Sequence, residues 1–273
     1  MPIGDEMLTT LEKTSRTFYL PIVRLPSGLK EAVAAGYLCM RAIDEIEDHE
    51  TLKNPVKAQL LRAISWVLQA QTTVENFAHH ELTAIFKDYV KILPEVTLRL
   101  GEWACAAPKF IAPRIWEATG AMADRMSHWA EKGWKIQTPA DLDRYTFGVA
   151  GAVGLLLCDI WAWFEQAQID REHAIQFGRG LQAVNILRNR KEDLSRGIDF
   201  FPKGWTYDDL QSYARNNLDG FNNYAQSLPR TSFISFVYIP RQLAYATLDA
   251  ISRGEEKVTR SMVLDIVQQA ERL

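Results

Sequence analysis

A polar stripe at helical spacing runs through residues 181–193, LQAVNILRNRKED. Gln182, Asn185, Asn189 and Asp193 follow one another at intervals of three, four and four residues, which puts them on one face of an α-helix. The stripe has apolar neighbours at Leu181, Ala183, Val184, Ile186 and Leu187, whereas the polar face of a surface helix is flanked by charged positions. We therefore expect the stripe to line a polar patch inside an apolar cavity. The alternative is a polar network that ties a helix bundle together.

An acidic group occurs earlier in the chain, in the segment RAIDEIEDHE. Asp44 and Asp48 lie one helical turn apart, Glu45 and Glu47 stand between them, and Arg41 precedes them. Carboxylates at this spacing repel each other on a bare helix, but a divalent cation between them would remove the repulsion. Mg²⁺ is the natural candidate, because it takes a few carboxylates and completes its shell with water and phosphate oxygens. The alternative is a solvated acidic face with Arg41 as an internal ion-pair partner.

The two stripes together favour a site for a hard cation and a phosphate. Asn185, Asn189 and Asp193 repeat the oxygen ligands of the acidic group, and Arg188 beside them would neutralise phosphate charge. We expect two helices to present these residues to one cavity.

Composition bounds the class of protein. The chain has 273 residues, 47% of them apolar, with eight Trp, nine Tyr and twelve Phe, which is enough for a sizeable core. The net charge of −3 and the absence of a basic run argue against nucleic acid as a partner. Cys39, Cys105 and Cys158 lie far apart in apolar segments, which fits neither a zinc site nor a disulfide framework. We expect buried thiols in a reducing compartment.

Neither the first residues nor the most apolar segment predicts a targeting or membrane segment. The sequence MPIGDEMLTT lacks the cationic and then apolar layout of a signal peptide, so we predict a cytoplasmic protein. Residues 149–164 are apolar, but Asp159 interrupts them and they fall short of the roughly 20 residues that a bilayer crossing needs. We expect a helix buried on nearly all sides.

The elements that must position these residues are helices. Prolines fall mostly where helical periodicity stops, and the segments between them carry apolar residues at helical spacing. Ser27 and Thr138, the latter followed by Pro139, are expected helix N-caps, and FISFVYI at 233–239 is the only strand candidate. No linker or repeat is present, so we predict one all-α domain over residues 1–273, a bundle of about eight to ten helices.

Four motifs give the chain a family resemblance. They are SRTFYLPIVRLP at 15–26, YLCMRAIDEIED at 37–48, YTFGVAGAVG at 145–154 and LQAVNILRNRKEDLSRGIDFFP at 181–202. In order and spacing the chain resembles squalene and phytoene synthases, dehydrosqualene synthases included, over essentially its whole length. The resemblance implies an isoprenoid-synthase helical bundle around a deep apolar channel, with two aspartate-rich motifs facing across it. It also implies Mg²⁺-dependent head-to-head joining of two prenyl diphosphates through a cyclopropyl intermediate.

The resemblance also implies roles for individual residues, matched motif by motif. The expected metal ligands are Asp44, Asp48, Asn185, Asn189 and Asp193. The expected substrate-binding residues are Arg16, Phe18, Tyr37, Arg41, Gln182, Asn185, Arg188, Tyr245 and Arg260. Asp44, Asp48, Asn189 and Asp193 are also the expected catalytic residues, together with Tyr145, which would lie near the reacting carbons.

The second motif departs from the family pattern in two places. Asn189 stands where the family has an aspartate, so one negative charge is missing, although an amide oxygen can still ligate a metal. The stretch RGIDFFP has Ile198 and Phe200 where the family has an arginine and a tyrosine. Together the changes alter the second diphosphate site.

This departure decides the predicted reaction. Ionising one allylic diphosphate needs a metal, cationic side chains and a pocket that tolerates a carbocation. Coupling also needs a second substrate held in register with water excluded, so an altered clamp loses coupling first. We therefore predict hydrolysis of farnesyl diphosphate to farnesol and pyrophosphate. The alternatives are head-to-head condensation of two farnesyl diphosphates to squalene or dehydrosqualene and, third, phytoene synthesis from C20 substrates. NADPH would be needed only for squalene.

A reading from another class is a non-catalytic isoprenoid-binding protein on a synthase scaffold. The retained metal and diphosphate residues argue against it, because a binder has little use for them. The expected partner is a prenyl diphosphate, the expected oligomeric state is a monomer, and any membrane contact for release of an apolar product would be peripheral.

Overall fold

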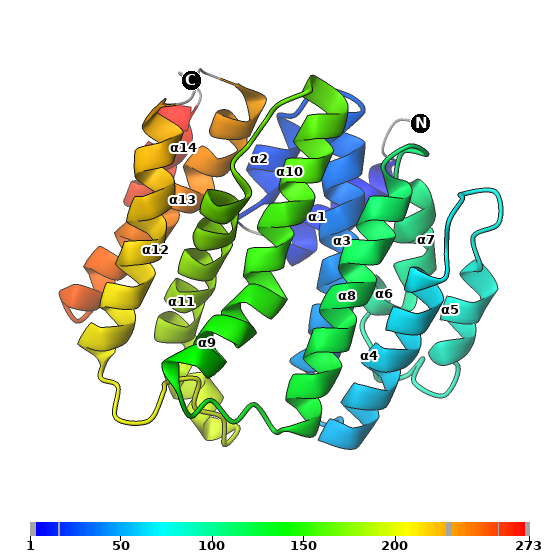
Figure 1. Ribbon diagram of the computed structural model, residues 1–273, viewed down its shortest axis with the longest axis horizontal. Coiled ribbons are helices and arrows are strands. Elements are labelled where there is room, and N and C mark those ends of the chain that lie inside the picture. Colours follow the sequence, from blue (N-terminus) through cyan, green and yellow to red (C-terminus); the bar gives the residue numbers. More distant parts are fainter. Residues whose placement is uncertain (1–3, 16, 228–230, 256, 271–273) are drawn as a thin grey trace. The chain divides into compact units, whose positions relative to one another are not determined.

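All regular secondary structure in the described part of the chain is helical. The computed structural model describes residues 4–15, 17–227, 231–255 and 257–270, and no strand occurs in these ranges (Figure 1). This confirms the predicted all-α class. The helices are α1 (Asp5–Thr14), α2 (Tyr19–Val23), α3 (Leu29–Glu47), α4 (Asn54–Gln69), α5 (His79–Ile85), α6 (Glu95–Leu98), α7 (Leu100–Ala106), α8 (Ala112–Glu131), α9 (Pro139–Thr146), the π-helical turn η1 (Phe147–Gly151), α10 (Ala152–Glu165), α11 (Arg171–Ser195), α12 (Tyr207–Ser227), α13 (Ser232–Ser252) and α14 (Arg260–Ala270).

The described helices outnumber the eight to ten expected, because short helices such as α2 and α6 occupy stretches between the long ones. Contacts divide the chain into two compact units. Unit 1 comprises residues 1–134 and 156–168, and unit 2 comprises residues 135–155 and 169–273. A single domain over residues 1–273 stays a prediction.

Helix α3 forms the core of unit 1. Leu29, Leu38, Ile43 and Ile46 on this helix are fully buried, and α4 and α8 pack along each other in the same unit (Figure 1). The N-cap of α3 is Gly28 instead of the predicted Ser27. The backbone N–H of Gly28 donates to the carboxylate of Glu31. The backbone of this glycine has a positive φ of 91°. Glycine adopts that conformation without steric cost, which is why the cap falls there.

Unit 2 is built on the long helix α11, which packs along α12 (Figure 1). The predicted cap at Thr138 is confirmed, because its hydroxyl accepts from the N–H of Asp141 at 3.1 Å and its own N–H donates to that carboxylate at 2.9 Å. Gly154 lies against the backbone carbonyl of Ala174 so closely that a Cβ would collide with it. A residue without a side chain at position 154 therefore allows α10 and α11 to pack closely here.

The strand candidate at 233–239 is wrong, because FISFVYI lies inside α13. The hydroxyl of Thr231 caps this helix by accepting from the N–H of Ile234. The buried residues Phe233, Phe236, Val237 and Pro240 follow helical spacing, so burial of one helix face outweighs the strand propensity of aromatic and β-branched side chains.

The apolar segment forms part of one continuous helix, Pro139–Glu165. This 27-residue helix is long and apolar enough to cross a membrane by length and composition, a test that core helices of soluble proteins also pass. Of its most apolar window 44% is buried, so burial is less complete than predicted. The prediction of buried thiols is correct for Cys39 and Cys158 and wrong for Cys105, which is exposed.

Candidate functional site

The C-terminal half of α3 and its C-cap residue carry four predicted site residues on one face. Tyr37, Arg41, Asp44 and Asp48 are spaced by four, three and four residues. The guanidinium of Arg41 donates to the Asp44 carboxylate at 2.5 Å and also to the carboxylate of Glu45. The arginine is thus both the internal ion-pair partner expected of a plain acidic face and a cation placed beside the acidic motif.

The carboxylate of Asp44 holds its proton more tightly than an ordinary aspartate does. Burial, and next the charge of Asp48, raise its pKa to about 7, although Arg41 opposes the shift. The side chain is still 33% exposed, so a ligand can reach it. A nearby cation favours the ionised form of such a carboxyl group, because its positive charge offsets the free-energy cost of ionising a buried acid.

The donor set of the first motif fits Mg²⁺. Asp44 and Asp48 offer carboxylate oxygens, the ligands that this cation prefers, and both side chains reach the surface. Across the described residues, no three His, Cys, Asp or Glu side chains converge on one point where they could hold a metal. Water and phosphate oxygens would have to complete the shell, which is the usual situation for protein-bound Mg²⁺.

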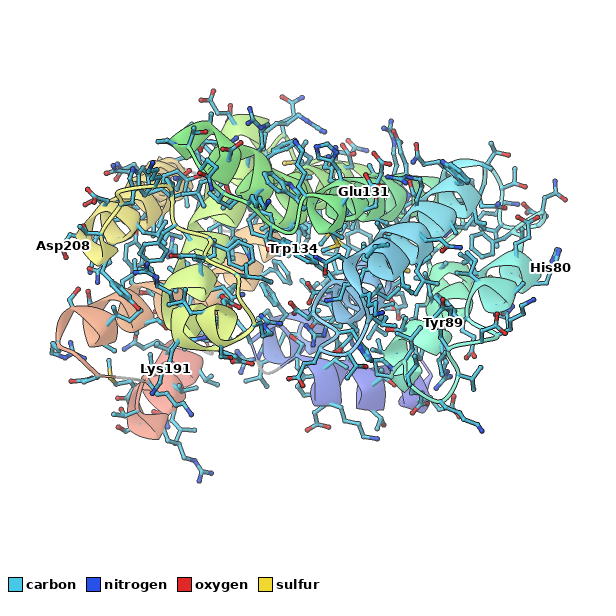
Figure 2. The ribbon with its side chains drawn as sticks, turned by 90° about the horizontal axis from the view of Figure 1, so that it is seen from below. His80, Tyr89, Glu131, Trp134, Lys191 and Asp208 are labelled. Atoms are coloured by element: carbon cyan, nitrogen blue, oxygen red, sulfur yellow. The ribbon has the colours of Figure 1, made fainter. Side chains whose placement is uncertain are left out.

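A buried polar cluster of Glu47, Lys57 and Trp134 supports the end of α3. It was not predicted from the sequence. Glu47 is 6% exposed, its carboxylate accepts from the indole N–H of Trp134 at 2.7 Å, and its backbone carbonyl accepts from the ammonium of Lys57 at 2.6 Å. The ammonium also lies 5.1 Å from the centroid of the indole ring. Trp134, labelled in Figure 2, is buried. Burial and the charges of Asp48 and Asp44 raise the pKa of Glu47 to about 8.

No sequence signal joins these residues, since 87 positions separate the glutamate from the tryptophan. Trp134 also adopts a left-handed φ of 50°, which a side chain other than glycine rarely takes. Local pattern therefore gives no reason to expect its ring beneath the acidic motif.

Two aromatic residues predicted to line the pocket lie next to each other before the acidic motif. The ring centroids of Phe18 and Tyr37 are 6.1 Å apart, and the Tyr37 hydroxyl donates to the carbonyl of Thr14 at 2.9 Å. Burial raises the pKa of this tyrosine. Arg16, the predicted basic contact, lies outside the described residues.

The polar stripe on α11 is held together by an arginine. The guanidinium of Arg188 donates to the amide oxygen of Asn185 at 2.8 Å and to that of Asn189 at 3.2 Å. The side-chain N–H of Asn189 donates to the same Asn185 oxygen at 3.1 Å. Gln182 lies half-buried on the preceding turn. The two amide oxygens predicted as metal ligands therefore already accept hydrogen bonds.

Asp193, the carboxylate of the second motif, is also paired. Its side chain is 7% exposed, and the guanidinium of Arg196 donates to it at 2.5 Å. The motif thus offers one carboxylate bound to an arginine and two neutral amides bound to Arg188. Mg²⁺, which prefers anionic oxygen ligands, does not fit this donor set.

The altered loop after α11 packs on the predicted catalytic tyrosine. The ring of Phe200 stacks on Tyr145 with centroids 4.7 Å apart and planes 20° apart. Asp199 accepts from Arg190 at 3.0 Å, and the guanidinium of this arginine lies 3.6 Å from the ring centroid of Phe201. Tyr145 is 4% exposed as a result of its packing.

Tyr245 and Arg260, two of the predicted substrate-binding residues, are not joined by any hydrogen bond or ion pair in the described part of the chain. The hydroxyl of Tyr245 donates instead to Asp219 on α12 at 2.6 Å, and burial raises the pKa of the tyrosine. Arg260 is exposed at the first position of α14.

Within unit 1 the structure therefore brings together Phe18, Tyr37, Arg41 and Asp44, with Asp48 on the same face. Within unit 2 it joins Asn185, Arg188 and Asn189.

Comparisons with known proteins agree with these motifs. A family model described as squalene/phytoene synthase matches residues 11–211. The squalene synthase of Schizosaccharomyces pombe is 28% identical over 90% of this chain and 59% of its own length. That of Eremothecium gossypii is 30% identical over 93% of this chain and 63% of its own length. The chain thus spans about three-fifths of the length of these curated relatives.

A solved structure has the same fold. The complex of TcSQS with the ligand BPH1237 superposes with a TM-score of 0.75 at 22% identity, over 97% of this chain and 86% of the other. The likeness confirms the predicted isoprenoid-synthase fold.

Proposed function

The chain belongs to the squalene/phytoene synthase family, and from this premise we propose that it is a Mg²⁺-dependent prenyltransferase joining two prenyl diphosphates head to head. Farnesyl diphosphate is the proposed substrate. The observation that carries the proposal is the face of α3, on which Asp44 and Asp48 stand beside Arg41 and the aromatic residue Tyr37.

The residues of this face have separate tasks. Asp44 and Asp48 would hold the metal, which supplies positive charge to the departing diphosphate when bound. Arg41 orients the Asp44 carboxylate and adds a second positive charge at the leaving group. Phe18 and Tyr37 present aromatic rings, whose faces attract a carbocation without reacting with it as water would.

Two observations support coupling over the farnesol release predicted from the altered second motif. The curated relatives are named squalene synthases, and none of those reported above is named as a hydrolase. The second motif also keeps an exposed cation, Arg188, with which a second diphosphate could pair. Loss of the aspartate at position 189 therefore does not by itself remove the means to hold a second substrate.

The test is the product. The pure protein is incubated with farnesyl diphosphate and Mg²⁺, with and without NADPH, and the organic products are identified by mass spectrometry. A C30 hydrocarbon or a presqualene-type diphosphate is the expected result, and a product that requires NADPH identifies squalene. Asp44→Asn should abolish it, whereas Asp124→Asn, an exposed aspartate on α8 of the same unit, should not.

Farnesol as the sole product would contradict coupling and would support hydrolysis of farnesyl diphosphate instead. A C40 product formed only from C20 diphosphates would contradict the proposed substrate and favour phytoene synthesis.

A further inference from the structure

We propose that the second motif of this chain binds a diphosphate directly through Arg188, without a metal ion of its own. The inference rests on the proposed function, since it concerns the same site. It departs from the expectation that both motifs ligate Mg²⁺.

The hydrogen bonds of the motif fit an anion. Asn185 Oδ1 already accepts from Arg188 and from Asn189, and the oxygen of Asn189 accepts from the same arginine. A metal ion at these oxygens would have to displace the guanidinium and lie beside it. The guanidinium itself is exposed, and no carboxylate pairs with it in the described part of the chain. Its planar set of N–H donors matches the oxygens of a phosphate.

The charges of the two motifs differ in sign. Residues 185–199 hold four basic and three acidic side chains, and Asp193 and Asp199 are each paired with an arginine. Residues 37–48 hold one basic and four acidic side chains. Residues 185–199 therefore attract an anion, and residues 37–48 attract a cation.

The helix dipole of α11 does not prevent Arg188 from binding an anion. The negative pole of a helix acts over its last turn, and Arg188 lies about two turns before the end of α11 at Ser195. Arg196, the C-cap residue, offsets this pole further.

Asn189 then has a specific role as a neutral residue. An aspartate here would form an ion pair with Arg188 and cancel its charge, whereas the amide only orients the guanidinium. The substitution that departs from the family pattern is the one that leaves the arginine available to a substrate.

The experiment measures binding of inorganic pyrophosphate to the full chain by calorimetry, with divalent metal removed by a chelator. The wild-type protein should bind. Arg188→Gln, which keeps an amide donor and removes the charge, should weaken binding roughly tenfold or more, the loss expected for a charged hydrogen bond. Asn189→Asp should weaken it as well. Arg144→Gln, an exposed arginine of unit 2 paired with Asp141, should leave it unchanged.

A second measurement counts bound Mn²⁺ by electron paramagnetic resonance. Asn189→Ala should bind as many ions as the wild-type protein, and a lost ion would overturn the inference. Absence of metal-free pyrophosphate binding, or binding indifferent to both Arg188→Gln and Asn189→Asp, would overturn it too.

Both measurements are made without turnover, so their results test the inference independently of the proposed reaction. A C30 product without metal-free binding refutes the inference alone, and metal-free binding without a C30 product refutes the reaction alone.

Discussion

The buried carboxyl of Glu47 predicts an unusual dependence of stability on pH. Its pKa is about 8 in the folded protein against an ordinary value of 4.5. Between these values the unfolded chain loses the proton while the folded chain keeps it. The stability that this group contributes is therefore fully present below pH 4.5 and is lost as pH rises through 8. Glu47→Gln removes the titration and keeps an oxygen that accepts from the indole N–H of Trp134.

The size of the effect follows from the shift. Each pH unit within the window changes the free energy of unfolding by about 1.4 kcal/mol, so the whole window amounts to roughly 5 kcal/mol. The free energy of unfolding of Glu47→Gln should therefore rise relative to that of the wild type as the pH increases. The relative increase from pH 4.5 should reach roughly 3 kcal/mol at pH 7 and level off above pH 8.

Urea unfolding followed by tryptophan fluorescence at pH 5, 6, 7 and 8 measures the difference. Glu131→Gln is the matched control, because this glutamate, labelled in Figure 2, is exposed on α8 and pairs with Arg62. A constant difference between Glu47→Gln and the wild type would refute the reasoning, as would a variant less stable than the wild type at pH 8.

Three further outcomes are expected. The apparent affinity for Mg²⁺ should rise about tenfold between pH 6 and pH 8, since the metal must displace a proton from Asp44, whose pKa is about 7; calorimetry at the two pH values checks this, and a flat affinity contradicts it. Gly154→Ala should lower the free energy of unfolding by roughly 1–3 kcal/mol through collision with Ala174, whereas Gly4→Ala, with no atom within 4 Å of the added Cβ, should not. Tyr37→Phe removes a hydrogen bond to a carbonyl of α1 and should cost about 1 kcal/mol in urea unfolding; no change would mean that water replaces it.

Local pattern predicted the helices and the residues that share one face. Helical spacing placed Asp44 and Asp48 one turn apart with Arg41 before them, and cap chemistry placed the start of α9 at Thr138. Both signals act within one or two turns of a helix, so the sequence contains all the information they need. The resemblance to known synthases supplied the roles of these residues, which spacing alone does not give.

Contacts made across long stretches of chain could not be predicted. The stacking of Phe200 on Tyr145 depends on the path of a loop, and the bond of Trp134 to Glu47 depends on a left-handed residue between two helices. The hydrogen bonds of Arg188 could not be predicted for a related reason. The sequence shows the loss of an aspartate at position 189, but the bonds of Arg188 to Asn185 and Asn189 become visible only in three dimensions.

The π-helical turn η1 lies between the two contacts of its helix, Tyr145 on Phe200 before it and Gly154 on Ala174 after it. Such a turn holds one residue more than an α-helical turn, which rotates everything before it by about 100° relative to everything after it. Deletion of a single residue within 147–151 would restore the ordinary winding, leave the glycine contact in place and swing the tyrosine off its partner. The direction in which this ring points is thus encoded by a one-residue insertion, and evolution can re-aim it by an insertion or deletion without rebuilding the packed half of the helix.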